Sequence, residues 1–195
     1  ALRRQGRWSE AADAMAKAVE LDPRNTSLLD ELGSTYWLAR RYSEADRPFE
    51  RAIAMRPQWA EPYKDAAFFE ITARGDLAKA QAILEEAGRV AGLKDDDRVL
   101  ANAALGFMRY RRDYQGALRH LEAEARDTTA ADQFSFSTIS LDRGLVHMWG
   151  GHQDLARRSF EAARVGLERR VTQNPDDYRL HSSLGIAYAG LGRRD

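Results

Sequence analysis

Apolar side chains recur along this chain at the spacing of one helical face, and the pattern returns about every 34 residues. In residues 6–25, 40–59 and 74–92, an alanine is followed by a larger apolar residue four positions on and by a second alanine three positions later. The first two segments are 34 residues apart, and the third is 35 residues further along. Because positions i, i+4 and i+7 share one face of a helix, each segment predicts an amphipathic helix.

A second kind of helix is predicted between these segments, in residues 28–37, 62–71, 99–108 and 180–192. In each, most of the positions i, i+3, i+4 and i+7 are apolar, and a small residue stands at the i+4 point, where two helices can approach closely. One helix pair cannot bury both of its apolar faces alone. Pairs in series share a continuous core, so the pattern predicts a solenoid.

These residues resemble the tetratricopeptide repeat (TPR), a helix–turn–helix unit of 34 residues. The unit at 26–59 carries the pattern most fully, with Leu29, Leu32, Gly33, Tyr36, Ala45, Phe49, Ala52 and Pro57. The resemblance implies an all-α, right-handed superhelical solenoid of antiparallel helix pairs, with about 5.5 units in a single array over residues 1–195. The units are expected at 1–25 (partial), 26–59, 60–92, 93–127, 128–175 and 176–195 (partial). Both edges read as cuts in a longer array, and the chain is also similar to the C-terminal TPR region of bacterial multidomain signalling proteins of the kinase, cyclase or regulator type.

The unit at 128–175 departs from the pattern at both of its helices. Pro175 follows Ala163 by 12 residues, whereas Pro57 follows Ala52 by 5, so its second helix is predicted to be about two turns longer than standard. Its first helix has two possible phases. Either Leu141, Leu145 and Met148 form the packing face, or His147 stands where the repeat has tyrosine.

Pro48 lies inside a predicted second helix, where proline removes a backbone hydrogen bond. Ser43 and Asp46 fit a capping box, which would put Pro48 at the edge of the first turn. The sequence therefore predicts a continuous helix from about Ser43 to Met55, with at most a small bend.

Composition narrows the classes of function. Lys plus Arg and Asp plus Glu both total 30, so the basic excess of a nucleic-acid binder is missing and no nucleic-acid partner is expected. Cysteine is absent, which excludes a disulfide framework and fits a reducing compartment; a cytoplasmic location is expected. No apolar run approaches the roughly 18 residues of a membrane span, so no membrane partner is expected.

The sequence gives little support for a catalytic site or a metal site. The four histidines, at 120, 147, 152 and 181, include no i, i+4 pair. The acidic run at 95–97 lacks the pattern of a calcium loop and is interpreted as the N-terminal cap of the following helix. The glycines lack the flanking residues of a phosphate loop. We expect no catalytic, cofactor-binding or metal site, and hence no enzyme.

In the TPR family, first helices line the concave face and the signature residues pack inside. Partner contacts are therefore expected on first-helix positions that point away from the core. These candidates are Asp30, Ser34, Trp37, Lys64, Phe68, Ile71, Leu105, Met108, Arg109 and Trp149. Aromatic, Met and Arg side chains are typical of interface cores, and Arg can bind a carboxylate through two hydrogen bonds. For Trp37 and Phe68, internal packing stays an equal alternative.

Two functions follow from this pattern. The first is a protein–protein interaction module, part of a larger protein, that holds a peptide or partner protein in its concave groove. The alternative is a structural or oligomerisation spacer that self-associates through the apolar side chains of the last helix, Leu184, Ile186 and Tyr188.

Overall fold

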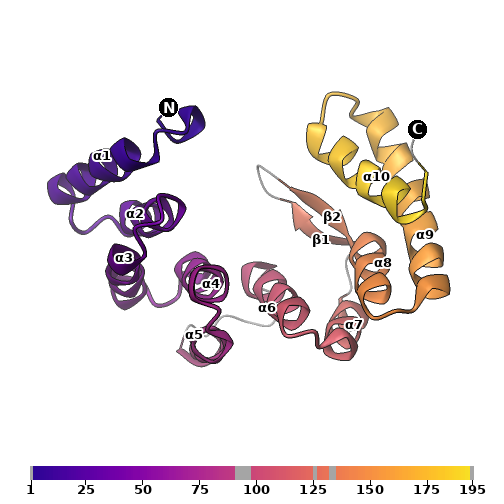
Figure 1. The fold of residues 1–195 in the computed structure, drawn as a ribbon, viewed down its shortest axis with the longest axis horizontal. Helices are drawn as coiled ribbons and strands as arrows, with labels where there is room; N and C mark the ends of the chain where they lie inside the picture. Colours follow the sequence, from indigo (N-terminus) through magenta and orange to yellow (C-terminus); the bar gives the residue numbers. More distant parts are fainter. Residues whose placement is uncertain (1, 91–97, 125–126, 132–134, 194–195) are drawn as a thin grey trace. The chain divides into compact units, whose positions relative to one another are not determined.

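The computed structural model describes residues 2–90, 98–124, 127–131 and 135–193, and its described part is built from helices and one short β-hairpin (Figure 1). The elements are the 3₁₀ turn η1 (Arg3–Gln5), α1 (Trp8–Leu21), α2 (Thr26–Leu38), α3 (Tyr42–Met55), α4 (Ala60–Phe69), the π-helical turn η2 (Glu70–Arg74), α5 (Leu77–Val90), α6 (Arg98–Tyr110), α7 (Tyr114–Ala123), β1 (Thr128–Ala131), β2 (Phe136–Thr138), α8 (Ile139–Trp149), α9 (Gln153–Gln173) and α10 (Tyr178–Gly190). The predicted helical class is confirmed, and the hairpin is an addition that the sequence did not predict.

The chain divides into two compact units, residues 1–104 and 105–195, with the division inside α6. In the first unit each helix from α1 to α5 packs on the next, and the two first helices α2 and α4 also contact each other. In the second unit α7 packs on α8, α8 on α9 and α9 on α10. Packing between successive helices is the arrangement expected of stacked helix pairs.

The signature residues of the repeat pack inside, as predicted. Leu29, Leu32, Ala45, Phe49 and Ala52 are all buried. The repeat's glycine is required by a close approach, because a Cβ on Gly33 would lie 2.7 Å from Cε1 of Phe49.

In the second unit one phenylalanine meets two such glycines. A Cβ on Gly144 of α8 would lie 2.6 Å from Cδ1 of Phe160, and one on Gly190 of α10 would lie 2.5 Å from Cδ2. Phe160, on α9, therefore contacts the backbones of both neighbouring helices.

Helix α3 runs without interruption through Pro48, which confirms the predicted continuity. The predicted capping box is wrong, because the N-cap is Arg41 and no side chain caps the helix through a hydrogen bond. Instead the Arg41 guanidinium donates to Glu44, with Nε 2.6 Å from Oε2. The helix begins at Tyr42, one residue earlier than predicted, so Pro48 lies in the second turn and not at the edge of the first. The hydrogen bond that Pro48 cannot make is the one to the carbonyl of Glu44.

The lengthened second helix of the fifth unit is confirmed, since α9 has 21 residues and α3 has 14. At 3.6 residues per turn the difference is about two turns. The added part carries Arg170, whose Nη2 lies 3.2 Å from Oδ2 of Asp127 and whose guanidinium lies over the ring of Phe136. The extra turns thus contact the hairpin region.

The hairpin is antiparallel, with Thr128 opposite Thr138 and Ala131 opposite Phe136. It leads directly into α8, whose N-terminus is capped by Thr138; Oγ1 accepts from the amide of Leu141 at 3.2 Å. The segment lacks the Asn-Gly or Asp-Gly turn that signals a tight hairpin in a sequence, which explains why it was not predicted.

Both faces of α8 pack against neighbouring helices, and this packing resolves the phase of the helix. Leu141, Leu145 and Met148 pack with α9 and α10, while Val146 packs with Leu121 of α7. His147 is only partly buried. The cap predicted at 95–97 lies outside the described residues.

Candidate functional site

Polar side chains from α2 and α4 meet on one surface, which we call the acidic face: Asp30 and Ser34 of α2 with Glu61, Lys64 and Asp65 of α4. Ser34 Oγ donates to Oδ2 of Asp65 at 3.5 Å. Lys64 Nζ lies 3.3 Å from Oδ1 of Asp65 and also pairs with Glu61. Three sequence-predicted residues, Asp30, Ser34 and Lys64, are therefore brought together.

Asp30 is the most unusual member of the acidic face. It is only 8% exposed, and its Oδ1 is buried without a hydrogen-bond partner among the described residues. Burial raises the pKa of Asp30 to about 8, and the neighbouring charge of Asp65 acts in the same direction. The carboxyl group is thus largely protonated at pH 7 and would ionise if a cation approached it.

Burial also raises the pKa of Asp65, although Lys64 opposes this shift. Burial alone would lower the pKa of Lys64, but Asp65 and Glu61 outweigh it and leave that pKa raised. One ammonium group thus serves two carboxylates, and Asp30 receives no hydrogen bond from it. This arrangement can accept a further cation from outside.

The other predicted candidates of the first unit turn partly inward. Trp37 packs on the core, with its ring centroid 6.3 Å from that of Phe69 in an edge-on geometry. Ile71 is 7% exposed, so it faces the interior and not a partner; the π-helical turn that holds it was not predicted. Phe68 is partly buried.

In the second unit, Leu105 was expected on the surface, but it is a core residue. It is 4% exposed and packs with Ala117, Leu121 and Val146, because α7 and α8 cover this side of α6. Met108 is partly buried against the same cluster.

Arg109 is also engaged within the chain. Its Nη1 lies 3.3 Å from Oδ1 of Asp142, and its guanidinium lies 4.8 Å from the ring centroid of Trp149. Trp149 itself is 42% exposed. Arg109 is therefore less available to a partner's carboxylate than the sequence suggested.

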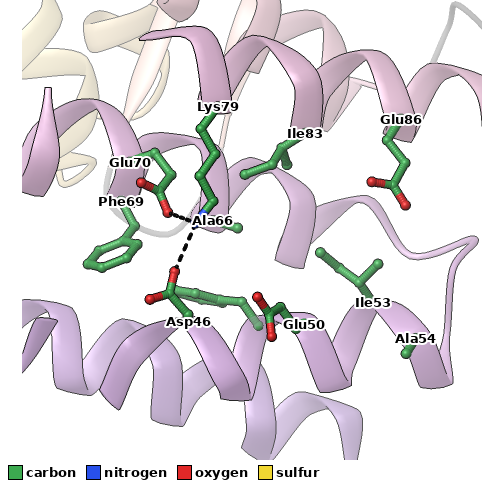
Figure 2. Close-up of a pocket in the computed structure, with 11 residues that line it drawn as sticks. Asp46, Glu50, Ile53, Ala54, Ala66, Phe69, Glu70, Lys79, Ile83 and Glu86 are labelled. Carbon is green, nitrogen blue, oxygen red and sulfur yellow. Dashed lines mark hydrogen bonds and ion pairs between the residues drawn. The ribbon is translucent and has the colours of Figure 1, made fainter. Parts of the chain in front are cut away.

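A pocket of about 360 Å³ lies between α3, α4, η2 and α5 (Figure 2). We call it the α3–α5 pocket. Its apolar lining includes Phe49, Ala66 and Phe69, all buried, together with Ile53 and Ile83. Its polar lining is formed by one lysine and four carboxylates: Lys79, Asp46, Glu50, Glu70 and Glu86.

An ion network closes one end of this pocket. Lys79 Nζ lies 2.7 Å from Oε1 of Glu70 and 3.3 Å from Oδ1 of Asp46, as Figure 2 shows. Arg74 pairs with the same two carboxylates, with Nη1 2.7 Å from Oε1 of Glu70. Glu70 is 1% exposed, and its Oε2 has no hydrogen-bond partner among the described residues.

The sequence candidates did not include the pocket residues. Glu70 and Arg74 belong to the π-helical turn η2, and π-turns occur often at functional sites. A signal for this turn existed, because the third segment is 35 residues after the second and not 34.

The described residues contain no group of three or more His, Asp and Glu side chains that could hold a metal ion. The His147 and His152 rings lie edge to face with centroids 6.1 Å apart, and burial lowers the pKa of His147. Among the described helices, none is long and apolar enough to cross a membrane.

Comparison with known proteins supports the fold. No family model matches the chain. The chain is 30% identical over 104 residues to the Hsp70-Hsp90 organizing protein of Triticum aestivum, and this match spans 49% of the chain but only 18% of that protein.

Two solved structures resemble the whole chain. A thermophilic TPR protein of Thermus thermophilus superposes with a TM-score of 0.66 at 18% identity, over 96% of this chain and 94% of that one. PilW, a type IV pilus biogenesis factor, gives a TM-score of 0.64 at 14% identity, over 100% of this chain and 90% of that one. The fold is therefore that of the tetratricopeptide repeat, as the sequence predicted.

Proposed function

We propose that the chain is a protein-interaction module whose acidic face binds a partner segment through a basic side chain. The observation that carries this proposal is the buried, unpartnered carboxyl group of Asp30 beside Asp65. Burying such a group without a partner lowers the stability of the fold, and a ligand that supplies an ammonium or guanidinium group offsets this loss on binding.

Charge on the acidic face sets the kind of partner. Glu61 and Asp65 stand against the single cation Lys64, and Asp30 adds its charge when a cation approaches, so an acidic segment is repelled and a basic one attracted. A protein partner is in keeping with the likeness to the Hsp70-Hsp90 organizing protein, whose name refers to two other proteins, Hsp70 and Hsp90. The short match to that longer protein is likewise in keeping with a module of a larger chain.

The test uses matched peptides and isothermal titration calorimetry. Two 12-residue peptides would share one apolar framework, with Arg at four positions in the first and Glu at the same positions in the second. We expect the Arg peptide to bind and the Glu peptide not to bind. Asp65→Asn and Asp30→Asn should each weaken binding by about tenfold, the loss of one charge-assisted hydrogen bond.

Asp176→Asn serves as the matched control, because Asp176 is an exposed aspartate in the turn before α10. It should leave the affinity unchanged. Equal binding of both peptides, or full affinity in Asp65→Asn, would contradict the assignment of the acidic face. Absence of binding by either peptide would contradict the interaction function itself.

Self-association is the second candidate function, and α10 favours it. Ile186 is 42% exposed on this helix, although Leu184 packs against the core. Light scattering across a concentration series would detect a dimer, and Ile186→Lys should abolish it. A monomer at all concentrations would remove this candidate.

A further inference from the structure

We infer that the α3–α5 pocket is a binding site for a small organic cation with an apolar body, such as an alkyl or aryl amine. This site is separate from the acidic face, because it is lined from α3 and α5, the second helices, as well as from the end of α4.

The size and lining of the pocket fit a small molecule. Its volume of about 360 Å³ lies within the range of roughly 300–1,000 Å³ that is common for ligand pockets. Phe49, Ala66 and Phe69 form an apolar floor, and Ile53 and Ile83 extend it from α3 and α5. An alkyl chain or an aromatic ring of the ligand would cover this floor.

The charge of the pocket selects a cation. Lys79 and Arg74 pair with Asp46 and Glu70, which leaves Glu50 and Glu86 as the uncompensated charges of the lining, so an anionic ligand would be repelled. Lys79 demonstrates the preference within the chain, since its ammonium group is held by Glu70 and Asp46 at one end of the pocket.

The opposite end is where a ligand's cation would lie. Glu86 of α5 stands there near Ile53, and Glu50 of α3 lies between Asp46 and Ile53 (Figure 2). Neither of the two makes a hydrogen bond or ion pair with any residue in the described part of the chain. A ligand ammonium placed near them would pair with these carboxylates, as Lys79 pairs with Glu70 and Asp46.

Glu70 shows that the Lys79 end of the pocket is already neutralised. It is almost wholly buried, and Lys79 and Arg74 both bind its Oε1. A ligand's cation is therefore expected at the carboxylates that no cation of the described chain binds, Glu50 and Glu86.

The experiment is a titration of the whole chain with four probes, followed by NMR chemical-shift changes. The probes are n-hexylamine and 2-phenylethylamine, with hexanoate and phenylacetate as partners of the same skeleton and opposite charge. We expect saturable shifts of the residues around Ile53 and Ile83 with the two amines only. Glu50→Gln combined with Glu86→Gln should weaken amine binding at least fivefold.

Two controls separate this site from general charge effects and from the acidic face. Glu20→Gln removes an exposed carboxylate of α1 and should leave amine binding unchanged. Asp65→Asn should also leave it unchanged, even though it weakens peptide binding. Thermal unfolding of each variant confirms that it is folded.

Equal binding of the carboxylates, shifts spread evenly over the surface, or an unchanged affinity in the doubly substituted variant would overturn the inference. A loss of amine binding in Asp65→Asn would overturn it too, since the two sites would then not be distinct. None of these results depends on whether a peptide binds the acidic face.

Discussion

Two buried aspartates on first helices make the most informative comparison in the molecule. Asp142 of α8 accepts hydrogen bonds from Thr129 and from Ser137, the latter at 3.0 Å, and pairs with Arg109 at 3.3 Å. Asp30 of α2 has a buried oxygen with no partner among the described residues. Both side chains are less than 9% exposed, so burial alone does not separate them.

The difference lies in what each carboxyl group does for its own unit. Asp142 fastens the hairpin and Arg109 to α8, so the cost of its burial is offset inside the fold. Asp30 has no such role, and its unit bears the cost. The proposed binding role of Asp30 rests on this contrast between a paired and an unpaired buried carboxyl group.

The largest effect is expected for Asp142→Ala. Removing this carboxylate leaves two hydroxyl groups and a guanidinium without their acceptor, so the free energy of unfolding should fall by about 3 kcal/mol. Urea unfolding followed by the fluorescence of Trp149, the single tryptophan of residues 105–195, measures this. A loss below about 1 kcal/mol would mean that the hairpin is held by other contacts.

The two units should respond alike to a second change, alanine in place of the packing glycine. Gly33→Ala and Gly144→Ala each force a methyl group against a phenylalanine ring and should cost about 1–3 kcal/mol. Gly88→Ala is the control, because a Cβ there meets no atom within 4 Å. Thermal unfolding of the three variants is the measurement, and equal midpoints in all of them would contradict the observed packing.

Asp30→Asn should raise the free energy of unfolding instead of lowering it, and the size of this gain should depend on pH. The pKa of Asp30 is raised from 3.8 to about 8 in the folded chain. The folded state therefore keeps a proton that the unfolded state releases, and this stabilising contribution is complete below about pH 4 and is lost as the pH rises through 8.

Asparagine cannot ionise, so the variant and the parent should be equally stable near pH 4, apart from a constant offset. At pH 8–9 the variant should gain about 1–3 kcal/mol over the parent. Urea unfolding at several pH values gives the two curves. If they run parallel from pH 4 to 9, Asp30 does not have the raised pKa.

The smallest effect is expected for Ser34→Ala. The hydroxyl group lies 3.5 Å from Asp65, at the limit of a hydrogen bond, so stability should change by less than about 0.5 kcal/mol. Thermal unfolding would show it. A loss above 1 kcal/mol would indicate that Ser34 orients Asp65 more strongly than the distance suggests.

Most of the fold could be predicted from the repeated sequence pattern, but little of the candidate site could. Ala45, Phe49 and Gly33 recur in register because stacked helices need the same close contact each time, so their burial could be predicted. Asp30, Ser34 and Lys64 could be placed on first helices, but that Ser34 reaches Asp65 while Asp30 does not depends on side-chain geometry between α2 and α4. Leu105 and Ile71 were misplaced, because helical phase alone does not show what covers a face.

Phe160 has a consequence for how the second unit opens. Its ring is held on one side by α8 through Gly144 and on the other by α10 through Gly190. A helix at the end of such an array would ordinarily fray first and exchange its amide hydrogens fastest. Because the Phe160 ring packs against both α8 and α10, separation of α10 would also disrupt the packing of α8 and α9. We therefore expect the central amides of α10 to exchange together with those of α8 in one cooperative step.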